Sequence, residues 1–183
     1  MKIGITGDTH GNVKAWKIIM DEYFKNADII LHTGDILAPG PKNSITKEYN
    51  PPELAQEINI TDIPLIFAKG NCDAEVDQML IKYPILAPYA FLYLENSKIL
   101  LTHGHLLGNL NAPDSPVKLY KIDILISGHT HRHSLKQEDD LILLNPGSPT
   151  VPFDNIPTIA LIENNEIKII RIDEDETLIS LKI

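Results

Sequence analysis

Five short apolar runs in this sequence are each followed by glycine together with aspartate, asparagine or histidine. The runs and the residues that follow them are Ile3–Thr6 with Gly7, Asp8 and His10; Ile29–Leu31 with Gly34 and Asp35; Leu65–Ala68 with Gly70 and Asn71; Ile99–Leu101 with His103 and Gly104; and Ile124–Ile126 with Gly128, His129 and His131. Short apolar runs bounded by turn residues are typical of buried strands. Because α/β sheets bind ligands at the carboxyl ends of their strands, the repetition predicts an α/β fold with one polar site.

The first half of the chain predicts helices between these strands. Apolar residues at helical spacing run from Val13 to Tyr23, and Asn12 is a suitable N-cap. A second helix is expected to begin at Asn50–Pro52, because proline is favoured in the first turn. A short third helix is expected around Val76–Leu80. Between the first two helices, Ala38–Pro52 is rich in Pro, Gly and Asn, which predicts a long loop.

The second half of the chain predicts hairpins. The paired runs are Phe91–Glu95 with Lys98–Thr102, Leu135–Glu138 with Leu141–Leu144, and Thr158–Glu163 with Glu166–Ile172, each separated by two turn residues. We therefore expect this half to be antiparallel. The alternation slips between Ile169 and Ile170, which indicates either a bulge or a strand that is covered on both faces. The acidic run Asp173–Glu176 indicates a solvated turn before a last strand, Leu178–Leu181. Together the halves favour two mixed sheets that face each other, with helices outside.

Composition and charge limit the classes of protein that fit. The chain has 183 residues and 43% hydrophobic content, enough for the core of one domain. No linker or repeat divides it, no apolar stretch approaches membrane-spanning length, and the single cysteine excludes an internal disulfide framework. We expect a cytoplasmic protein. A net charge of −9 makes non-specific binding of nucleic acid or of an anionic membrane unfavourable.

The residues at the strand ends offer two carboxylates, four imidazoles and one amide: Asp8, His10, Asp35, Asn71, His103, His129 and His131. Mixed oxygen and nitrogen ligands suit Mn, Zn, Fe or Ni better than Mg or Ca alone. Seven ligands exceed what one ordinary site needs, whereas two metals that share a carboxylate would use them all. Because a metal pair can clamp both the attacking and the leaving oxygen of a phosphoryl transfer, phosphoester hydrolysis is the leading reaction class.

In order and residue type these motifs resemble those of the calcineurin-like metallophosphoesterases. The matching segments are Asp8–His10, Gly34–Asp35, Gly70–Asn71, His103–Gly104 and Gly128–His131. Within the family the sequence is similar to the small bacterial phosphodiesterases of the YfcE type, through Gly40–Asn43, Gly70–Leu80, Thr102–Gly108 and Asn145–Ser148. The resemblance covers nearly the whole chain. It implies a four-layer αββα sandwich of two mixed β-sheets flanked by helices, as a single domain over residues 1–183.

The same resemblance implies two divalent metal ions, commonly Mn²⁺, and a role for each matching position. Asp8, His10 and His131 would hold the first metal; Asn71, His103 and His129 would hold the second; and Asp35 would bridge them. The implied activity is hydrolysis of a small phosphodiester by a metal-bound hydroxide. The candidate catalytic residues are Asn71, Cys72, His103 and His105.

One position departs from a common family pattern. Many members have histidine directly after the asparagine of the third motif, where this chain has Cys72. A thiol is smaller than an imidazole and mostly uncharged at neutral pH. Because the YfcE-type subgroup shares the cysteine, we interpret it as a subgroup feature, and it leaves open how well monoesters with poor leaving groups are hydrolysed.

Several other residues keep a structural interpretation beside a functional one. His32 lies inside the second strand and His133 on an expected exposed turn, so both are expected to be structural. His105 is equally consistent with a substrate contact and with a strand-end filler, and Asp73 is interpreted as a cap of the helix that follows it. Lys42 and Asn43 are candidates for substrate contact, with an irregular surface loop as the alternative.

A protein-binding scaffold is the alternative function. A eukaryotic retromer subunit of similar size shares the family fold but acts mainly in protein binding, and scaffolds of that kind have replaced part of the metal-binding set. This chain has all seven positions, which favours the enzyme. Relatives often assemble as dimers or tetramers, so a homo-oligomer is a further expectation.

Overall fold

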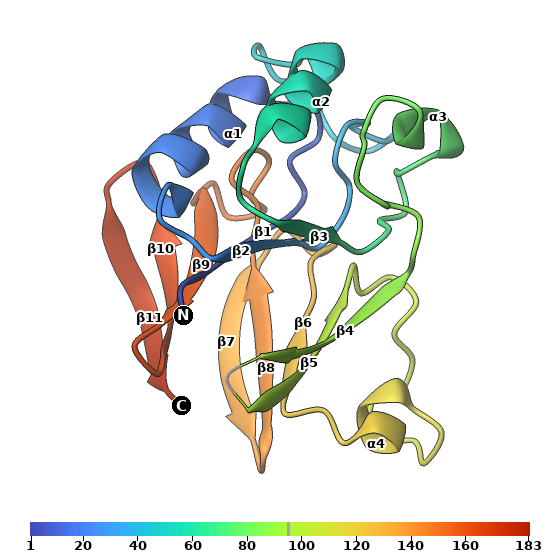
Figure 1. Ribbon diagram of the computed structural model, residues 1–183, viewed down its shortest axis with the longest axis vertical. Helices are drawn as coiled ribbons and strands as arrows, with labels where there is room; N and C mark the ends of the chain where they lie inside the picture. Colours follow the sequence, from blue (N-terminus) through green and yellow to red (C-terminus); the bar gives the residue numbers. More distant parts are fainter. Residues whose placement is uncertain (95) are drawn as a thin grey trace.

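The computed structural model describes residues 1–94 and 96–183, and two mixed β-sheets face each other at its centre (Figure 1). The first sheet has the strand order β11-β10-β9-β1-β2-β3 and the second has the order β4-β5-β6-β8-β7. The strands are β1 (Ile3–Thr6), β2 (Ile29–His32), β3 (Leu65–Phe67), β4 (Tyr89–Leu94), β5 (Ser97–Thr102), β6 (Ile124–Ile126), β7 (His133–Glu138), β8 (Leu141–Pro146), β9 (Thr158–Glu163), β10 (Glu166–Arg171) and β11 (Glu176–Lys182).

Helices cover the outer faces of both sheets. The helices are α1 (Val13–Ile18), the π-helical turn η1 (Ile19–Phe24), α2 (Pro51–Ile60), α3 (Glu75–Gln78) and α4 (Pro116–Tyr120). In Figure 1, α1 and α2 lie over the first sheet, and α4 lies at the opposite side of the molecule. The predicted four-layer αββα sandwich is therefore confirmed. Among the described residues, no helix is both long and apolar enough to cross a lipid bilayer.

Three apolar clusters hold these layers together. Trp16 and Phe24 belong to the cluster between the first helices and the first sheet, while Ile5 and Ile126 belong to the cluster between the two sheets. A smaller cluster packs Val117 of α4 against the second sheet. Burial of an aromatic or aliphatic side chain stabilises a fold by about 1.5–3 kcal/mol, so this layered core fixes the loops at the strand ends.

The predicted helix starts are present. Asn12 Oδ1 accepts the backbone N–H of Ala15, and Asn50 Oδ1 accepts that of Glu53, so each asparagine caps its helix. The first helix continues after Ile18 as the π-helical turn η1, which still buries Ile19 and Tyr23 as the apolar spacing predicted, and which also buries Phe24.

The second half of the chain is not wholly antiparallel, contrary to our expectation. The three predicted hairpins β4–β5, β7–β8 and β9–β10 are present, although Glu95, expected to end the first strand of the first hairpin, lies outside the described residues. However, β6 pairs in parallel with both β5 and β8. The segment between β5 and β6 contains α4, which the sequence analysis did not predict, and such a crossover allows parallel pairing.

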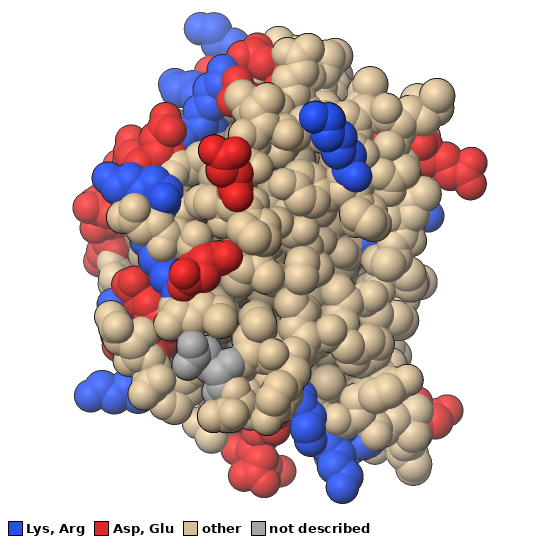
Figure 2. Space-filling model, in the orientation of Figure 1, with Lys and Arg blue, Asp and Glu red and all other residues tan. Residues whose placement is uncertain are grey.

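The irregularity predicted within β10 is present, but it lies in the pairing with β11. Strand β10 pairs with β9 without a shift in register, whereas its pairing with β11 shifts register between Ile169 and Ile170. The acidic turn that follows is exposed, and Arg171 forms ion pairs with Asp173 and Glu174. Figure 2 shows acidic and basic side chains close together on the side of the molecule where Figure 1 places β10 and β11. The last strand, β11, is three residues longer than the predicted Leu178–Leu181.

Candidate metal centre

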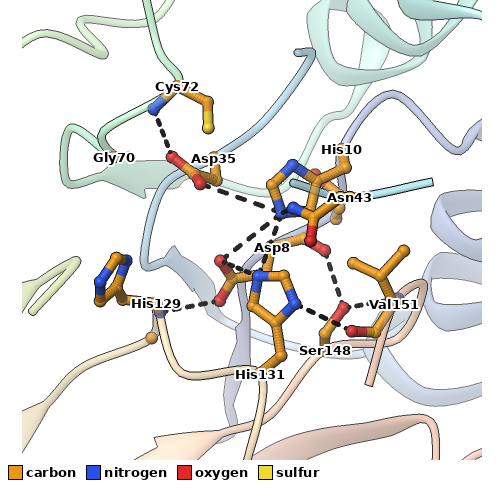
Figure 3. Close-up of polar contacts among 12 residues, drawn as sticks. Asp8, His10, Asp35, Asn43, Gly70, Cys72, His129, His131, Ser148 and Val151 are labelled. Carbon is orange, nitrogen blue, oxygen red and sulfur yellow. Dashed lines mark hydrogen bonds and ion pairs between the residues drawn. The ribbon is translucent and has the colours of Figure 1, made fainter. Parts of the chain in front are cut away.

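The predicted ligand residues all follow strands whose carboxyl ends meet between the two sheets. Strands β1, β2 and β3 run parallel in the first sheet, and β5 and β6 run parallel in the second. Figure 3 shows side chains from both sheets gathered at one place, among them Asp8 and Asp35 from the first sheet and His129 from the second. The residues from the first sheet are Asp8, His10, Asp35 and Asn71, and those from the second are His103, His129 and His131.

Three of these residues form one close group. Asp8 Oδ1 lies 3.2 Å from His131 Nε2 and 3.8 Å from His10 Nε2. The two imidazole nitrogens, His10 Nε2 and His131 Nε2, are 3.2 Å apart. Asp8 and His10 are buried, whereas His131 is only partly covered. These are the three residues predicted to hold the first metal.

A second group forms around His103, and Asp35 lies between the two groups. His103 Nε2 is 3.0 Å from Asn71 Oδ1 and 3.5 Å from Asp35 Oδ1. The other carboxylate oxygen, Asp35 Oδ2, is 3.9 Å from His10 Nε2 in the first group. His129 adjoins the second group, with its ring centroid 5.0 Å from that of His103. Asp35 thus presents one oxygen to each group, the arrangement that a bridging ligand needs.

Three of the imidazoles are oriented by backbone carbonyls. His10 Nδ1 donates to Ala38 O at 2.7 Å, His103 Nδ1 donates to Thr33 O at 3.0 Å, and His131 Nδ1 donates to Val151 O at 2.9 Å. Because a carbonyl only accepts, Nδ1 carries the proton in each neutral ring, which leaves the Nε2 lone pair facing the centre. Metal-binding histidines are held by this kind of contact.

The centre therefore collects acceptor atoms that face one another. His103 Nε2 and Asn71 Oδ1 are both acceptors at 3.0 Å, and the buried Asp8 Oδ1 has no hydrogen-bond donor among the described residues. Burial lowers the pKa of His103, in spite of the carboxylates of Asp8 and Asp35, so its ring stays neutral near pH 7. Converging lone pairs repel one another unless a cation lies between them, so these nitrogen and oxygen atoms fit the ligands of divalent metal ions.

The backbone at the centre is strained. Five of the seven residues have positive φ angles: Asp8 at 51°, His10 at 43°, Asp35 at 56°, His129 at 70° and His131 at 54°. This region costs a residue with a side chain roughly 1–2 kcal/mol. Strained residues cluster at functional sites, where the surrounding structure holds them in place.

Two motif glycines allow loops to approach closely at the centre, Gly70 within the first sheet and Gly128 between the two sheets. A Cβ on Gly70 would overlap Asp35 Oδ1, and a Cβ on Gly128 would overlap Thr33 Oγ1 and lie 2.7 Å from Asp8 Oδ2. Both positions are buried. The glycines of the motifs are therefore needed for space beside the carboxylates, and not only for turns.

Cys72 and His105, two of the candidate catalytic residues, lie beside the second group. The backbone N–H of Cys72 donates to Asp35 Oδ1 at 2.8 Å, and Asn71 Nδ2 lies 3.2 Å from its sulfur. Burial, together with the adjacent Asp35 carboxylate, raises the pKa of the Cys72 thiol to about 12, so the thiol keeps its proton. His105 lies with its ring centroid 5.3 Å from that of His103, and its Nδ1 is buried without a hydrogen-bond partner among the described residues.

Asp73 does not cap the helix that follows it, contrary to our expectation. Its carboxylate accepts backbone N–H groups from Asp35 at 2.9 Å, Ile36 at 2.8 Å and Gly70 at 2.7 Å. The N-terminus of α3 is held by Asp77, whose Oδ2 accepts the N–H of Ala74. Asp73 therefore joins the loop after β2 to the loop after β3.

The structural role predicted for His32 is confirmed. The ring is fully buried and packs against Trp16 and Phe67. Its Nδ1 accepts the N–H of Gly34, and Nε2 lies 3.1 Å from Thr9 Oγ1. His133 was expected on an exposed turn, but it begins β7, is partly covered, and lies 3.5 Å from Asp154 Oδ2.

His32 predicts an acid-sensitive fold. Burial lowers its pKa from 6.5 to about 3, so between these values the unfolded chain binds a proton that the folded chain excludes. Stability should therefore fall as the pH falls from 6.5 toward 3, by about 1.4 kcal/mol per pH unit from this residue alone. The measurement is the free energy of unfolding of the metal-free protein against pH, for the native sequence and for His32→Gln. The difference between the two curves removes the other titrating groups, and parallel curves would contradict the prediction.

A cavity of about 280 Å³ opens directly onto the centre. Its lining includes the predicted ligands Asp35, Asn71, His129 and His131, with Cys72, Thr130 and the loop residues Pro39, Gly40, Pro41, Lys42 and Asn43. The structure thus brings both loop residues that were candidates for substrate contact, Lys42 and Asn43, to the wall of this cavity.

Two residues that support the site were not assigned a role from sequence. Ser148 Oγ donates to the carbonyl of Asp8 at 2.8 Å, and Asn145 Nδ2 donates to the carbonyl of Gly128 at 2.9 Å (Figure 3 shows Ser148). Asn145 lies near the end of β8, and Ser148 follows this strand. Both belong to the run Asn145–Ser148, in which the Pro-Gly pair was the sequence signal that could have pointed to a role. The two side chains thus bind the backbones of the loops that follow β1 and β6.

Comparisons with known proteins identify the family of this chain. The calcineurin-like phosphoesterase superfamily domain matches residues 1–166. Phosphodiesterase YfcE of Escherichia coli strain K12 is 32% identical over 185 residues, covering 100% of this chain and 98% of YfcE. The solved structure of E. coli YfcE, described as a phosphoesterase, matches with a TM-score of 0.90 and 31% identity, covering 100% of both chains.

A more distant match shows the fold alone. Vps29 of Entamoeba histolytica, solved in complex with Zn²⁺, matches with a TM-score of 0.65 and 20% identity, covering 100% of this chain and 98% of that one. The family match over residues 1–166 and the full-length similarity to YfcE decide the family. This chain belongs to the calcineurin-like phosphoesterase superfamily.

Proposed function

We propose that this protein is a metal-dependent phosphodiesterase that hydrolyses small phosphodiesters, with the whole chain, residues 1–183, acting as one domain. The observation that carries the proposal is the cluster of facing acceptor atoms, in which His10, His131 and Asp8 form one group and His103 and Asn71 the other. Family membership supports the reaction class, and the full-length similarity to Phosphodiesterase YfcE supports a diester substrate.

One divalent ion would be held by Asp8, His10 and His131, and a second by Asn71, His103 and His129. Both ions would be in contact with Asp35. When bound, such ions neutralise the charge of the phosphate and make a water molecule acidic enough to attack phosphorus near neutral pH. We propose Mn²⁺ as the native ion, with Zn²⁺, Fe²⁺ or Ni²⁺ as alternatives, because the ligands mix imidazole with oxygen.

The protein's own groups orient this chemistry. The carbonyls of Ala38, Thr33 and Val151 keep the histidine rings turned toward the centre. The neutral thiol of Cys72, on the cavity wall, carries no charge to stabilise a leaving group. Substrates should therefore need a good leaving group, which favours activated diesters over alkyl monoesters.

A scaffold function is less well supported. Vps29 shares the fold, but at 20% identity the likeness says nothing about activity. The enzyme is supported by the presence of all seven proposed ligands in the sequence and by the carbonyls that orient three of the imidazoles, which a pure scaffold does not need. We also propose a cytoplasmic location, because a chain with one cysteine suits a reducing compartment.

The proposal predicts a metal-dependent diesterase. Metal-stripped protein should be inactive on bis(p-nitrophenyl) phosphate, and added Mn²⁺ should restore hydrolysis, with slower release from p-nitrophenyl phosphate. The measurement is the initial rate on both compounds with Mn²⁺, Zn²⁺, Fe²⁺ and Ni²⁺ in turn. Folded protein that binds these ions but hydrolyses neither compound would contradict the proposal and favour the scaffold.

A further inference from the structure

The loop Pro39–Asn43 forms one wall of the cavity above the metal centre, and Asn43 contacts that centre through His10. The amide is partly covered, while the neighbouring Lys42 is exposed. Figure 3 shows the Asn43 side chain beside the ring of His10, on the side of the centre away from His129.

The orientation of this amide is fixed by two acceptors. Asn43 Nδ2 donates to Pro39 O at 2.9 Å, and it lies 3.2 Å from His10 Nε2. Because His10 Nδ1 donates to Ala38 O, His10 Nε2 is an acceptor, so the second N–H of Asn43 points at it. Both contacts require nitrogen at this position and exclude the flipped amide.

The nitrogen that Asn43 contacts is the predicted metal ligand. A metal ion on His10 Nε2 would take the lone pair that now accepts this N–H. The amide would then keep its bond to Pro39 O and have one N–H free for an anion bound at the metals. An amide donor at that point is matched to a phosphoryl oxygen.

The loop is built to hold this donor still. Pro39 and Pro41 fix two φ angles, and Gly40, at φ +69°, allows the loop to approach Cys72, whose sulfur would lie 2.6 Å from a Cβ on Gly40. A donor that is oriented before substrate arrives loses little entropy on binding. The long loop predicted over Ala38–Pro52 has no periodicity in the sequence, but contacts hold its first part, Pro39–Asn43, in place.

We propose that Asn43 is a catalytic residue that donates its free Nδ2–H to a non-bridging oxygen of the bound phosphate. The proposal rests on the proposed phosphodiesterase function, and it names the residue that orients the phosphoryl group in the cavity. No bond is made or broken by Asn43, which stabilises charge on the phosphoryl oxygens as the reaction proceeds.

The test compares Asn43→Ala with the native protein and with Ser44→Ala, the exposed neighbour that does not line the cavity. For Asn43→Ala loaded with Mn²⁺, we expect kcat/KM on bis(p-nitrophenyl) phosphate to fall about 100-fold. The dissociation constant for inorganic phosphate, measured by calorimetry, should rise about 10-fold. Metal content and melting temperature should match those of the native protein, and Ser44→Ala should be unchanged in every measurement.

Two results would overturn this inference. Lower metal content that accompanies the lost activity would show that Asn43 only positions His10, and unchanged phosphate affinity with unchanged kcat would show that it does not contact the anion. Failure of the proposed function is separate, because native protein loaded with metal would then hydrolyse nothing while the phosphate titrations could still be compared.

Discussion

Asp35→Asn is expected to lower kcat on bis(p-nitrophenyl) phosphate by about 1,000-fold, the cost of losing several kcal/mol of charge stabilisation. The Asp35 carboxylate directs Oδ1 toward His103 and Oδ2 toward His10, and it lies between the two groups of acceptors. Asparagine has one oxygen and an NH₂ in place of the second. Asparagine can bind a cation through its oxygen toward only one of the two groups, and its NH₂ places hydrogen-bond donors where a cation is needed.

The substitution is chosen to leave the fold unchanged. Asp35 has a φ of 56°, and asparagine tolerates this conformation as well as aspartate does. Oδ1 can still accept the N–H of Cys72, so the loop after β3 keeps its contact. Metal analysis should find less than the native content, while circular dichroism and melting temperature of the metal-free protein stay unchanged. Native turnover with native metal content in Asp35→Asn would sink the two-metal arrangement.

The strand ends explain why much of the site could be predicted from sequence. Each predicted ligand lies within a few residues of an apolar run and a glycine, as in Gly7–His10 and Gly128–His131, so each signal is local. Parallel strands place their carboxyl ends at one edge of a sheet. A local pattern repeated five times therefore predicts a shared location without any knowledge of the pairing order.

Contacts that are distant in sequence could not be predicted in this way. The parallel pairing of β6 with β5 and β8 depends on the crossover through α4, which has only five residues and a weak apolar pattern. Asn43 was noticed in a loop, but its contact with His10 joins residues far apart in the chain. Sequence spacing carries little information about such contacts, because they are set by how the loops pack.

Asp73 was misinterpreted for the same reason. An aspartate two residues before a helix is typical of a local cap. Its three partners include Asp35 and Ile36 in the loop after β2, and the pattern of residues near Asp73 does not indicate them. The sequence did not show that Asp73 is only 4% exposed. A carboxylate that is so deeply buried needs several hydrogen-bond donors, which a helix cap alone does not provide.

Replacing Asp73 with alanine should consequently destabilise the fold more than the loss of a helix cap. Three backbone N–H groups, from Asp35, Ile36 and Gly70, would lose their acceptor in a buried place. An unsatisfied buried donor costs about 1–3 kcal/mol, so we expect the free energy of unfolding to fall by about 3–5 kcal/mol. Burial raises the pKa of Asp73 to about 6, so urea titrations at pH 8 compare alanine with the ionised carboxylate.

Asp77→Ala is the matched control, since it removes a single acceptor from the N–H of Ala74 at the start of α3. A lost cap of this kind costs about 1 kcal/mol. If Asp73 were also only a cap, the two variants would unfold at similar urea concentrations. If it joins the loops, Asp73→Ala should unfold much earlier than Asp77→Ala. The metal affinity of Asp73→Ala should fall as well, because the backbone of Asp35 would no longer be held beside Gly70.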